Sequence, residues 1–153
     1  MKFWLLDTGP IVAFLDPRDA EHETVAAVMG SFSGRLVTTS AVVVEAMYLL
    51  GSVRSGALLL IEFLLASLTD VHECTSLESL TEAAHLMAKY ADVPMDFADA
   101  TLVLLAERLK VHRVCTLDRR GFRAYRTRTR KAFQLVLDEH PAPAPRTGRR
   151  RRA

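Results

Sequence analysis

Residues 3–10 have the sequence Phe-Trp-Leu-Leu-Asp-Thr-Gly-Pro, an apolar run that ends at an acid and a turn. Four consecutive apolar residues are typical of a strand whose two faces are both covered. The turn that follows indicates the start of a helix, and Pro10 suits its first position. A buried strand that leads directly into a helix predicts the first β-α unit of an α/β protein.

The rest of the chain alternates in the same way between short β-compatible runs and helical patterns. Helices are predicted at residues 20–32, 40–50, 55–68, 76–90 and 98–110, with strands at 35–38, 70–74, 113–116 and, at one edge, 133–137. Ser40 is the expected N-cap of the second of these helices. Strands separated by helices favour right-handed crossovers and a parallel sheet with helices on both faces.

The length of 153 residues allows one domain, which we expect at residues 1–138. Residues 139–153 are rich first in Pro and Ala and then in Arg, a composition that predicts a disordered tail. Glu62 interrupts the longest apolar run, so no membrane span is expected. Cys74 and Cys115 form no C-x-x-C pair, which favours a protein of the reducing cytoplasm without disulfides.

Charge is distributed unevenly along the chain. Residues 1–118 contain 8 basic and 16 acidic side chains, whereas residues 119–153 contain 12 basic and 2 acidic ones. An acidic body with a basic end indicates a site that attracts cations beside a surface that attracts polyanions, although a solvated face explains many charge runs.

Two aspartates stand just after predicted strands. Asp7 follows the first strand, and Asp118 follows the strand at residues 113–116 after only one intervening residue. Ligands of open α/β sheets bind at the carboxyl ends of the strands. If these two strands are neighbours, both carboxylates face one crevice.

Three further acids have an ordinary explanation and a functional one. Glu45 lies in an apolar stretch of its helix, so it either faces solvent or points into a wet, cation-containing cleft. Asp96 and Asp99 begin a helix, where they could simply cap it, but that helix leads directly to the strand before Asp118. Each capping or surface role is plausible singly, while the combination favours one shared acidic site.

Carboxylates that converge on one pocket repel one another, and a divalent cation relieves that repulsion. Oxygen ligands without a His or Cys cluster suit Mg²⁺ or Mn²⁺ rather than Zn²⁺. The five histidines are scattered without the spacing of metal ligands. Such a metal centre is suited to the hydrolysis of phosphodiester bonds, so the acids predict a nuclease.

The acidic motifs, in their order along the chain, resemble those of PIN-domain ribonucleases, and most closely the VapC-type toxins of bacterial toxin–antitoxin pairs. The resemblance rests on Leu6-Asp7-Thr8, Thr39-Ser40 with Glu45, Asp96-Phe97-Ala98-Asp99-Ala100 and Thr116-Leu117-Asp118 with Phe122, and it covers residues 3–137. It implies a three-layer α/β/α sandwich with a parallel sheet and an endoribonuclease dependent on Mg²⁺ or Mn²⁺. It also implies a homodimer that is capped by a cognate VapB-type antitoxin.

The resemblance assigns roles to individual positions. The acidic quartet of the family matches Asp7, Glu45, Asp99 and Asp118. Of these, Asp7 and Asp99 are the principal expected metal ligands, with Asp118 as a third. The resemblance also implies supporting roles for Thr8, Asp96 and Thr116. Asp96 and Asp99 are both candidates for the third acid of the quartet. The resemblance favours Asp99, because Asp99 opens the Asp-Ala element of the motif at residues 96–100.

Residues 119–131 directly follow the last acid and contain seven basic side chains and no acidic one. Their charge would offset the repulsion between the acids and RNA phosphates. The expected RNA-binding residues are Arg119, Arg120, Arg123 and Arg126. Phe122 and Tyr125 are candidates for stacking on unpaired bases, although Phe122 suits a core position equally.

Two other functional classes remain open at this point. One is a non-catalytic module that binds RNA or protein on the same fold. The other is a phosphatase or receiver domain that uses an aspartate at a strand end, but such phosphatases carry a second Asp two residues later, where this chain has Gly9.

Overall fold

The computed structural model describes residues 1–140. The tail for which disorder was predicted, residues 139–153, lies almost entirely outside this range. The strands are β1 (Phe3–Leu6), β2 (Arg35–Thr39), β3 (Asp70–His72), β4 (Arg113–Cys115) and β5 (Gln134–Leu135). The α-helices are α1 (Thr8–Leu15), α2 (His22–Gly30), α3 (Ser40–Leu49), α4 (Gly56–Ala66), α5 (Leu77–Lys89), α6 (Phe97–Leu109) and α7 (Arg119–Ala124). Two short 3-10 helices complete the list, at Leu50–Ser52 and Val136–Asp138.

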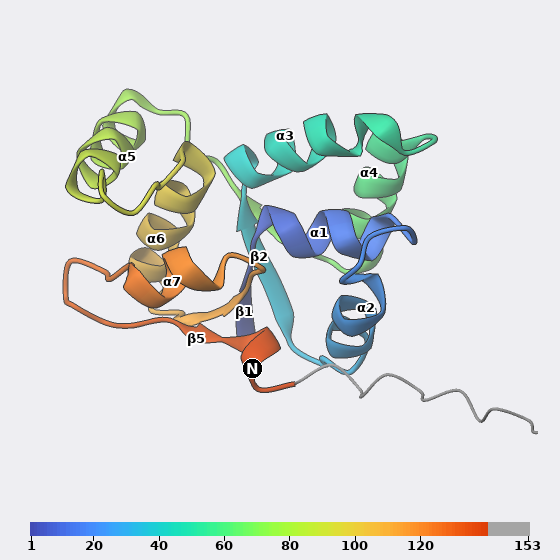
Figure 1. Cartoon of the computed structure of the whole chain (residues 1–153). Helices are drawn as coiled ribbons and strands as arrows, with labels where there is room; N and C mark the ends of the chain where they lie inside the picture. Colours follow the sequence, from blue (N-terminus) through green and yellow to red (C-terminus); the bar gives the residue numbers. More distant parts are fainter. Residues whose placement is uncertain (141–153) are drawn as a thin grey trace, which may run out of the picture.

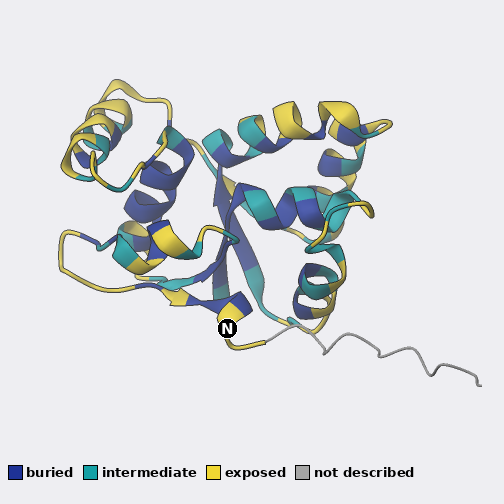
Figure 2. Cartoon of the chain, viewed as in Figure 1, coloured by how far each residue is buried: buried dark blue, intermediate teal, exposed yellow. Residues whose placement is uncertain are grey.

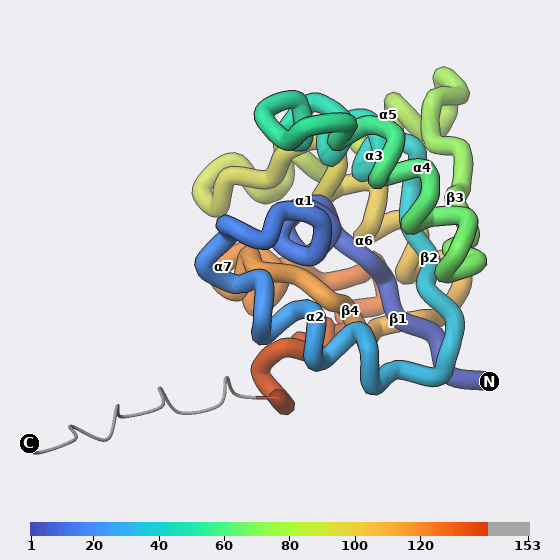
Figure 3. The backbone as a smooth tube through the Cα atoms, turned by 90° about the vertical axis from the view of Figure 1, so that its right-hand side faces the viewer, coloured from blue at the N-terminus to red at the C-terminus, as the bar shows by residue number. Residues whose placement is uncertain are grey.

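The five strands form one parallel sheet in the order β3-β2-β1-β4-β5. Figure 1 shows α5 and α6 on one side of the strands and α1, α2 and α4 on the other, and Figure 3 shows β1 between β2 and β4. This arrangement confirms the predicted α/β/α sandwich. The strand that carries Asp7 and the strand that leads to Asp118 are direct neighbours, with Leu6 paired to Cys115.

The middle of the sheet is sealed from water. Leu5 and Leu6 of β1 have no exposed surface, which explains why β1 is a continuous apolar run rather than an alternating one. Figure 2 shows the central strands buried, while exposed residues lie on the outer faces of α3, α4 and α5. The site-bearing ends of the strands are therefore fixed by a packed core.

Pro10 and Ser40 each lie one or two positions further into their helices than predicted. Helix α1 begins at Thr8, so Pro10 is its third residue, because the side chain of Asp7 accepts a hydrogen bond from the first helical N–H. Helix α3 begins at Ser40, and its cap is Thr39, whose hydroxyl oxygen accepts from the N–H of Val42. In both cases the capping side chain is the last residue before the helix.

The end of the chain differs more from the prediction. The segment after Asp118 forms the short helix α7, which was not predicted from the sequence because its three arginines and Gly121 obscure the apolar pattern. The edge strand expected at residues 133–137 is reduced to β5, two residues long, and it ends in a 3-10 helix. Cys74 and Cys115 are both buried, and each is a free thiol.

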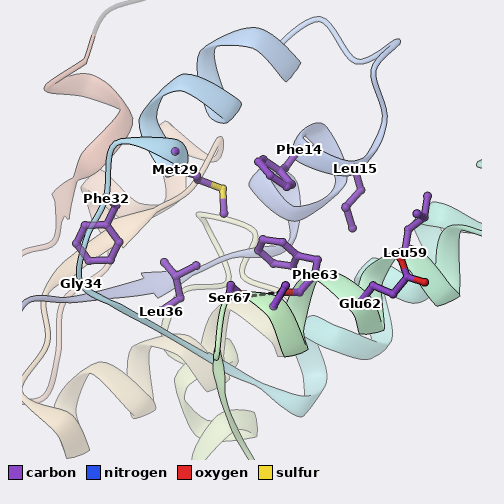
Figure 4. A pocket seen from close by; sticks show the side chains of 12 residues that line it. Phe14, Leu15, Met29, Phe32, Gly34, Leu36, Leu59, Glu62, Phe63 and Ser67 are labelled. Atoms are coloured by element: carbon purple, nitrogen blue, oxygen red, sulfur yellow. Dashed lines mark hydrogen bonds between the residues drawn. The ribbon is translucent and has the colours of Figure 1, made fainter.

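An apolar cavity of about 530 Å³ lies between α1, α2 and α4, and Figure 4 shows Phe14, Met29 and Phe63 facing into it. None of the predicted site residues lines this cavity. Within the described part of the chain, every helix is too short or too polar to cross a lipid bilayer.

Gly34 provides a test of the packing at the start of β2. The rings of Trp4 and Phe32 stack with centroids 3.6 Å apart, and a Cβ on Gly34 would lie 2.3 Å from Phe32 and 2.4 Å from the carbonyl oxygen of Lys2. We expect Gly34→Ala to lower the free energy of unfolding by about 1–3 kcal/mol, measured by urea denaturation. Gly30→Ala is the control, because its Cβ meets no atom of residues 1–140 within 4 Å. Equal stability of the two variants would contradict this account.

Candidate active site

Asp7 lies at the boundary between β1 and β4 and is held from three directions. Its backbone N–H donates to the carbonyl of Cys115 at 3.1 Å, which extends the pairing of the two strands by one bond. Its Oδ1 accepts from the N–H of Thr8 at 2.7 Å, and its Oδ2 accepts from the hydroxyl of Thr116 at 2.6 Å. Only 6% of Asp7 is exposed. The orientation of this carboxylate is therefore fixed by the fold.

Asp118 is tied to the same network through Thr116. The N–H of Asp118 donates to the hydroxyl oxygen of Thr116 at 3.0 Å, and the hydroxyl in turn donates to Asp7. The Oδ1 of Asp118 accepts from the N–H of Gly121 at 3.0 Å and caps α7. Thr116 thus joins two of the predicted acids through one hydroxyl.

Asp96 and Asp99 cap α6 together. The Oδ1 of Asp96 accepts from the N–H of Asp99 at 2.8 Å, and the Oδ2 of Asp99 accepts from the N–H of Asp96 at 3.2 Å. Asp96 is exposed, whereas only 9% of Asp99 is exposed. The burial of Asp99 beside Tyr125, whose hydroxyl lies 3.5 Å from its Oδ2, is consistent with Asp99 as the third acid.

Glu45 faces the acidic cluster rather than solvent alone. It lies on α3, and its carboxylate accepts a hydrogen bond from the hydroxyl of Thr8, the first residue of α1. Glu45 and Asp96 also line one groove of about 740 Å³, between α3 and the start of α6. The structure therefore connects the fourth predicted acid to Asp7, through Thr8, and to the Asp96–Asp99 cap, across the groove.

The acids raise one another's pKa values. Burial raises the pKa of Asp7 to about 6, with further contributions from Glu45 and Asp96, although hydrogen bonds from Thr116 and Thr8 act in the opposite direction. Burial raises the pKa of Asp99 to about 8, and the negative charges of Asp96, Asp7 and Asp118 add to the effect. These mutual effects show that carboxylates from separate segments of the chain interact electrostatically at one place.

Two other titratable groups respond to the same charges. The pKa of Glu45 is raised by burial and by Asp96, against the hydrogen bond from Thr8. Burial and the nearby carboxylates of Asp99, Asp118 and Asp96 raise the pKa of Tyr125 above its usual range, so this phenol remains a neutral hydrogen-bond donor. The cluster is thus rich in oxygen ligands and poor in compensating positive charge.

The donor set suits a hard divalent cation. Carboxylate and hydroxyl oxygens that repel one another when ionised are the ligands that Mg²⁺ and Mn²⁺ prefer. In the described residues, no three His, Cys, Asp or Glu side chains are already arranged around one ion position. The oxygens of Asp7, Asp99 and Asp118 instead accept the protein hydrogen bonds given above.

Fewer of the basic side chains after Asp118 are free to bind a ligand than the composition of the segment suggests. Arg119 and Arg123 both form ion pairs with Asp138, each at 2.8 Å. Arg126 donates to the backbone carbonyls of Arg123 and Tyr125, each at 2.7 Å. Arg120 is exposed and forms no ion pair with any described residue, so its charge is available to a ligand.

Stacking of RNA bases on Phe122 or Tyr125 is excluded in this structure, because neither residue has exposed surface. Their rings meet edge to face with centroids 5.3 Å apart, inside the apolar core. The sequence analysis considered Tyr125 only as a surface residue and missed its contact with Asp99. The alternation of apolar Phe122 and Tyr125 with arginines, at a spacing of three, is the helical signal that could have revealed it.

The comparisons with known proteins agree with this geometry. The family model of the PIN domain matches residues 4–127. Ribonuclease VapC26 of Mycobacterium tuberculosis is 32% identical over 125 residues, which make up 80% of this chain and 91% of that protein. The crystal structure of VapC20 of Mycobacterium tuberculosis, a toxin that cleaves the sarcin–ricin loop, has a TM-score of 0.70 at 18% identity, and the match covers 77% of this chain and 91% of that one.

The fold and the acidic edge of its sheet thus define a PIN domain, and this chain belongs to the PIN-domain family. Within that family, its identity to a VapC ribonuclease over most of both chains makes it a VapC-type member. The likeness to the crystal structure of VapC20 supports the fold alone.

The raised pKa values predict how the metal-free protein responds to pH. The folded state holds protons on Asp7 up to about pH 6 and on Asp99 up to about pH 8, whereas the unfolded chain releases them near the ordinary aspartate pKa of 3.8. Between these limits the folded state binds more protons, so its stability falls as the pH rises. We expect the Tm in EDTA to be higher at about pH 5.5 than at about pH 8.5.

Asp99→Asn should flatten this dependence, while Asp92→Asn, which removes an exposed carboxylate outside the cluster, should leave it unchanged. Differential scanning calorimetry measures both variants. A Tm that increases with pH over this range in the unmodified protein would contradict the electrostatic account of the cluster.

Proposed function

We propose that this protein is a metal-dependent endoribonuclease that acts as the toxin of a VapBC-type toxin–antitoxin pair. The observation that carries this proposal is that Asp7, Glu45, Asp99 and Asp118 lie near one another at the carboxyl edge of a PIN-domain sheet, where they are linked through the hydroxyls of Thr8 and Thr116 and through electrostatic effects on one another. The identity to a protein named ribonuclease supports RNA as the substrate. The reaction is the hydrolysis of a phosphodiester bond by water.

The proposed cofactor is Mg²⁺ or Mn²⁺, held by Asp7 and Asp99 with Asp118 as a third ligand. When bound, the ion supplies positive charge that offsets the carboxylates and the developing charge on the phosphate. Thr116 orients Asp7 and the backbone of Asp118, and Thr8 orients Glu45. Glu45 borders the open groove, where its carboxylate is placed to accept a proton from the attacking water.

The basic side chains after Asp118 are the proposed contacts to the RNA backbone. Arg120 is the principal one, because Arg119 and Arg123 share Asp138 as an ion-pair partner and Arg126 is bound to backbone carbonyls. Ion pairs at the surface contribute little free energy, so Arg119 and Arg123 can exchange Asp138 for a phosphate. These contacts position RNA without reading its sequence.

The proposal includes the partners that the family resemblance implies. A cognate VapB-type antitoxin would hold the toxin inactive, and two copies of the toxin would form a homodimer in the cytoplasm. The exposed apolar side chains on α3 and α4, among them Val44, Tyr48, Leu58 and Leu65, provide surface for such protein contacts.

Variants of Asp7 and Asp99 test the metal site. We expect Asp99→Asn to reduce Mn²⁺-dependent cleavage of RNA by about 100-fold or more, because it removes a charged ligand. Asp92→Asn is the control: it removes an exposed carboxylate outside the cluster, so we expect activity within about threefold of the unmodified protein.

Asp7→Asn should be as inactive as Asp99→Asn, and EDTA should stop cleavage by the unmodified protein. Cleavage is measured with end-labelled RNA, and folding by circular dichroism. If Asp7→Asn and Asp99→Asn fold and retain both cleavage and RNA affinity, the acids are not catalytic, and the non-catalytic binding module becomes the better description.

A second pair of variants tests the RNA-binding surface. Arg120→Ala should weaken RNA binding and reduce the slope of log K against log salt concentration by about 0.7, the value for one contact to single-stranded RNA. Arg128→Ala is the control, because Arg128 is already paired with Glu107 at 2.6 Å and Glu82 at 3.4 Å. Filter binding at several salt concentrations measures both, and identical slopes for the two variants would contradict the assignment of Arg120.

A further inference from the structure

Tyr125 is the largest side chain that is completely buried in the described structure, and packing explains its ring but not its hydroxyl. The ring meets Phe122 and Tyr90 edge to face, with centroids 5.3 and 5.2 Å away. A Phe would make the same contacts. The hydroxyl adds a polar atom to an apolar cluster, and such an atom costs free energy unless it has partners.

The hydroxyl of Tyr125 has partners on both sides of the start of α6. Its single hydrogen is shared between two acceptors, the carbonyl oxygen of Pro94 at 3.0 Å and, at the longer distance of 3.5 Å, the Oδ2 of Asp99. Pro94 stands two residues before the N-cap Asp96. The buried hydroxyl of Tyr125, on the α7 side of the site, is thus connected both to the loop that leads into α6 and to Asp99 in the first turn of α6.

Gly121 shows how tightly this region is packed. A Cβ on Gly121 would lie 2.1 Å from the Oδ2 of Asp118 and 2.8 Å from the hydroxyl oxygen of Tyr125. No side chain fits there without moving one of the two. The Tyr125 hydroxyl, Asp118 and Asp99 therefore share one confined space, so the placement of each constrains the others.

We propose that Tyr125 is a positioning residue of the metal site, whose hydroxyl holds the Asp99 carboxylate in register with Asp118 across the junction of α6 and α7. This inference rests on the proposed function, because it assumes that Asp99 is a metal ligand. Hydrogen-bonding partners of metal ligands fix the orientation of those ligands, and their loss weakens both metal binding and activity.

A purely structural role for Tyr125 makes a different prediction, and Tyr90 separates the two. Tyr90 belongs to the same aromatic cluster, and its hydroxyl also bridges to the segment after α7: it accepts from the N–H of Arg126 at 2.9 Å. Among the described residues, the hydroxyl of Tyr90 has no hydrogen bond to a carboxylate. Tyr90→Phe therefore removes a comparable hydroxyl from the same cluster without touching the acids.

The experiment compares Tyr125→Phe with Tyr90→Phe. Binding of Mn²⁺ to the RNA-free protein is measured by electron paramagnetic resonance, and kcat and KM are measured with RNA. We expect Tyr125→Phe to bind Mn²⁺ about tenfold more weakly and to lower kcat by a similar factor, with KM for RNA unchanged. Tyr90→Phe should leave Mn²⁺ affinity and kcat unchanged, even if it lowers the Tm as much as Tyr125→Phe does.

Amino-acid analogues at position 125 provide the rescue. A para-aminophenylalanine restores a hydrogen-bond donor at the end of the ring and should restore Mn²⁺ affinity, whereas para-methylphenylalanine has the same size without a donor and should not. If Tyr125→Phe fails to fold, the two analogues still show whether Mn²⁺ affinity depends on a hydrogen-bond donor at the end of the ring. Equal Mn²⁺ affinity of the two analogues, or of Tyr125→Phe and Tyr90→Phe, would overturn the proposal.

The two proposals can fail separately. If the unmodified protein binds Mn²⁺ but cleaves no RNA, the proposed endoribonuclease is wrong while the Mn²⁺ titrations still decide the role of Tyr125. If the unmodified protein binds no Mn²⁺, there is no metal site to position, and the inference about Tyr125 is wrong.

Discussion

The mutual repulsion of the carboxylates at the carboxyl edge of β1 and β4 is the constraint around which the structure is organised. Asp7 and Asp99 lie in surroundings that disfavour their charged forms, as their raised pKa values show. A polar cluster in a region of low dielectric is tolerated only when its oxygens have partners. Here the partners are the hydroxyls of Thr8, Thr116 and Tyr125, together with backbone N–H groups.

The same acids begin helices, and this dual use explains how the fold tolerates them without an ion. Asp7 caps α1, Asp96 caps α6 with the help of Asp99, and Asp118 caps α7. The N-terminal end of a helix carries partial positive charge, which favours a nearby carboxylate. A capping role and a site role are therefore compatible at these positions. The caps hold the carboxylates in place, and the remaining repulsion is what a divalent cation would relieve.

The aspartates of the site lie at the ends of strands and the starts of helices, as the sequence predicted, because these positions follow from local patterns. A continuous apolar run predicts a central strand, so Asp7 had to stand at the edge of a parallel sheet, and the strand before Asp118 is indeed its neighbour. The same reasoning was less successful after Asp118. Asp138 lies 19 residues beyond Arg119 in the chain, so no local pattern indicated that it would pair with Arg119 and Arg123. Local composition overstated the free positive charge of this segment.

The sequence by itself determined the α/β class, the parallel sheet and the order of the acids, because periodicity and chain direction are local properties. Only the tertiary structure decided that Tyr125 points inward to Pro94, 31 residues away in sequence, and that Asp99 is buried while Asp96 is exposed. These outcomes depend on how α6 and α7 pack beside the ends of the strands. Packing between distant segments depends on the shape of the whole core, which no short stretch of sequence encodes.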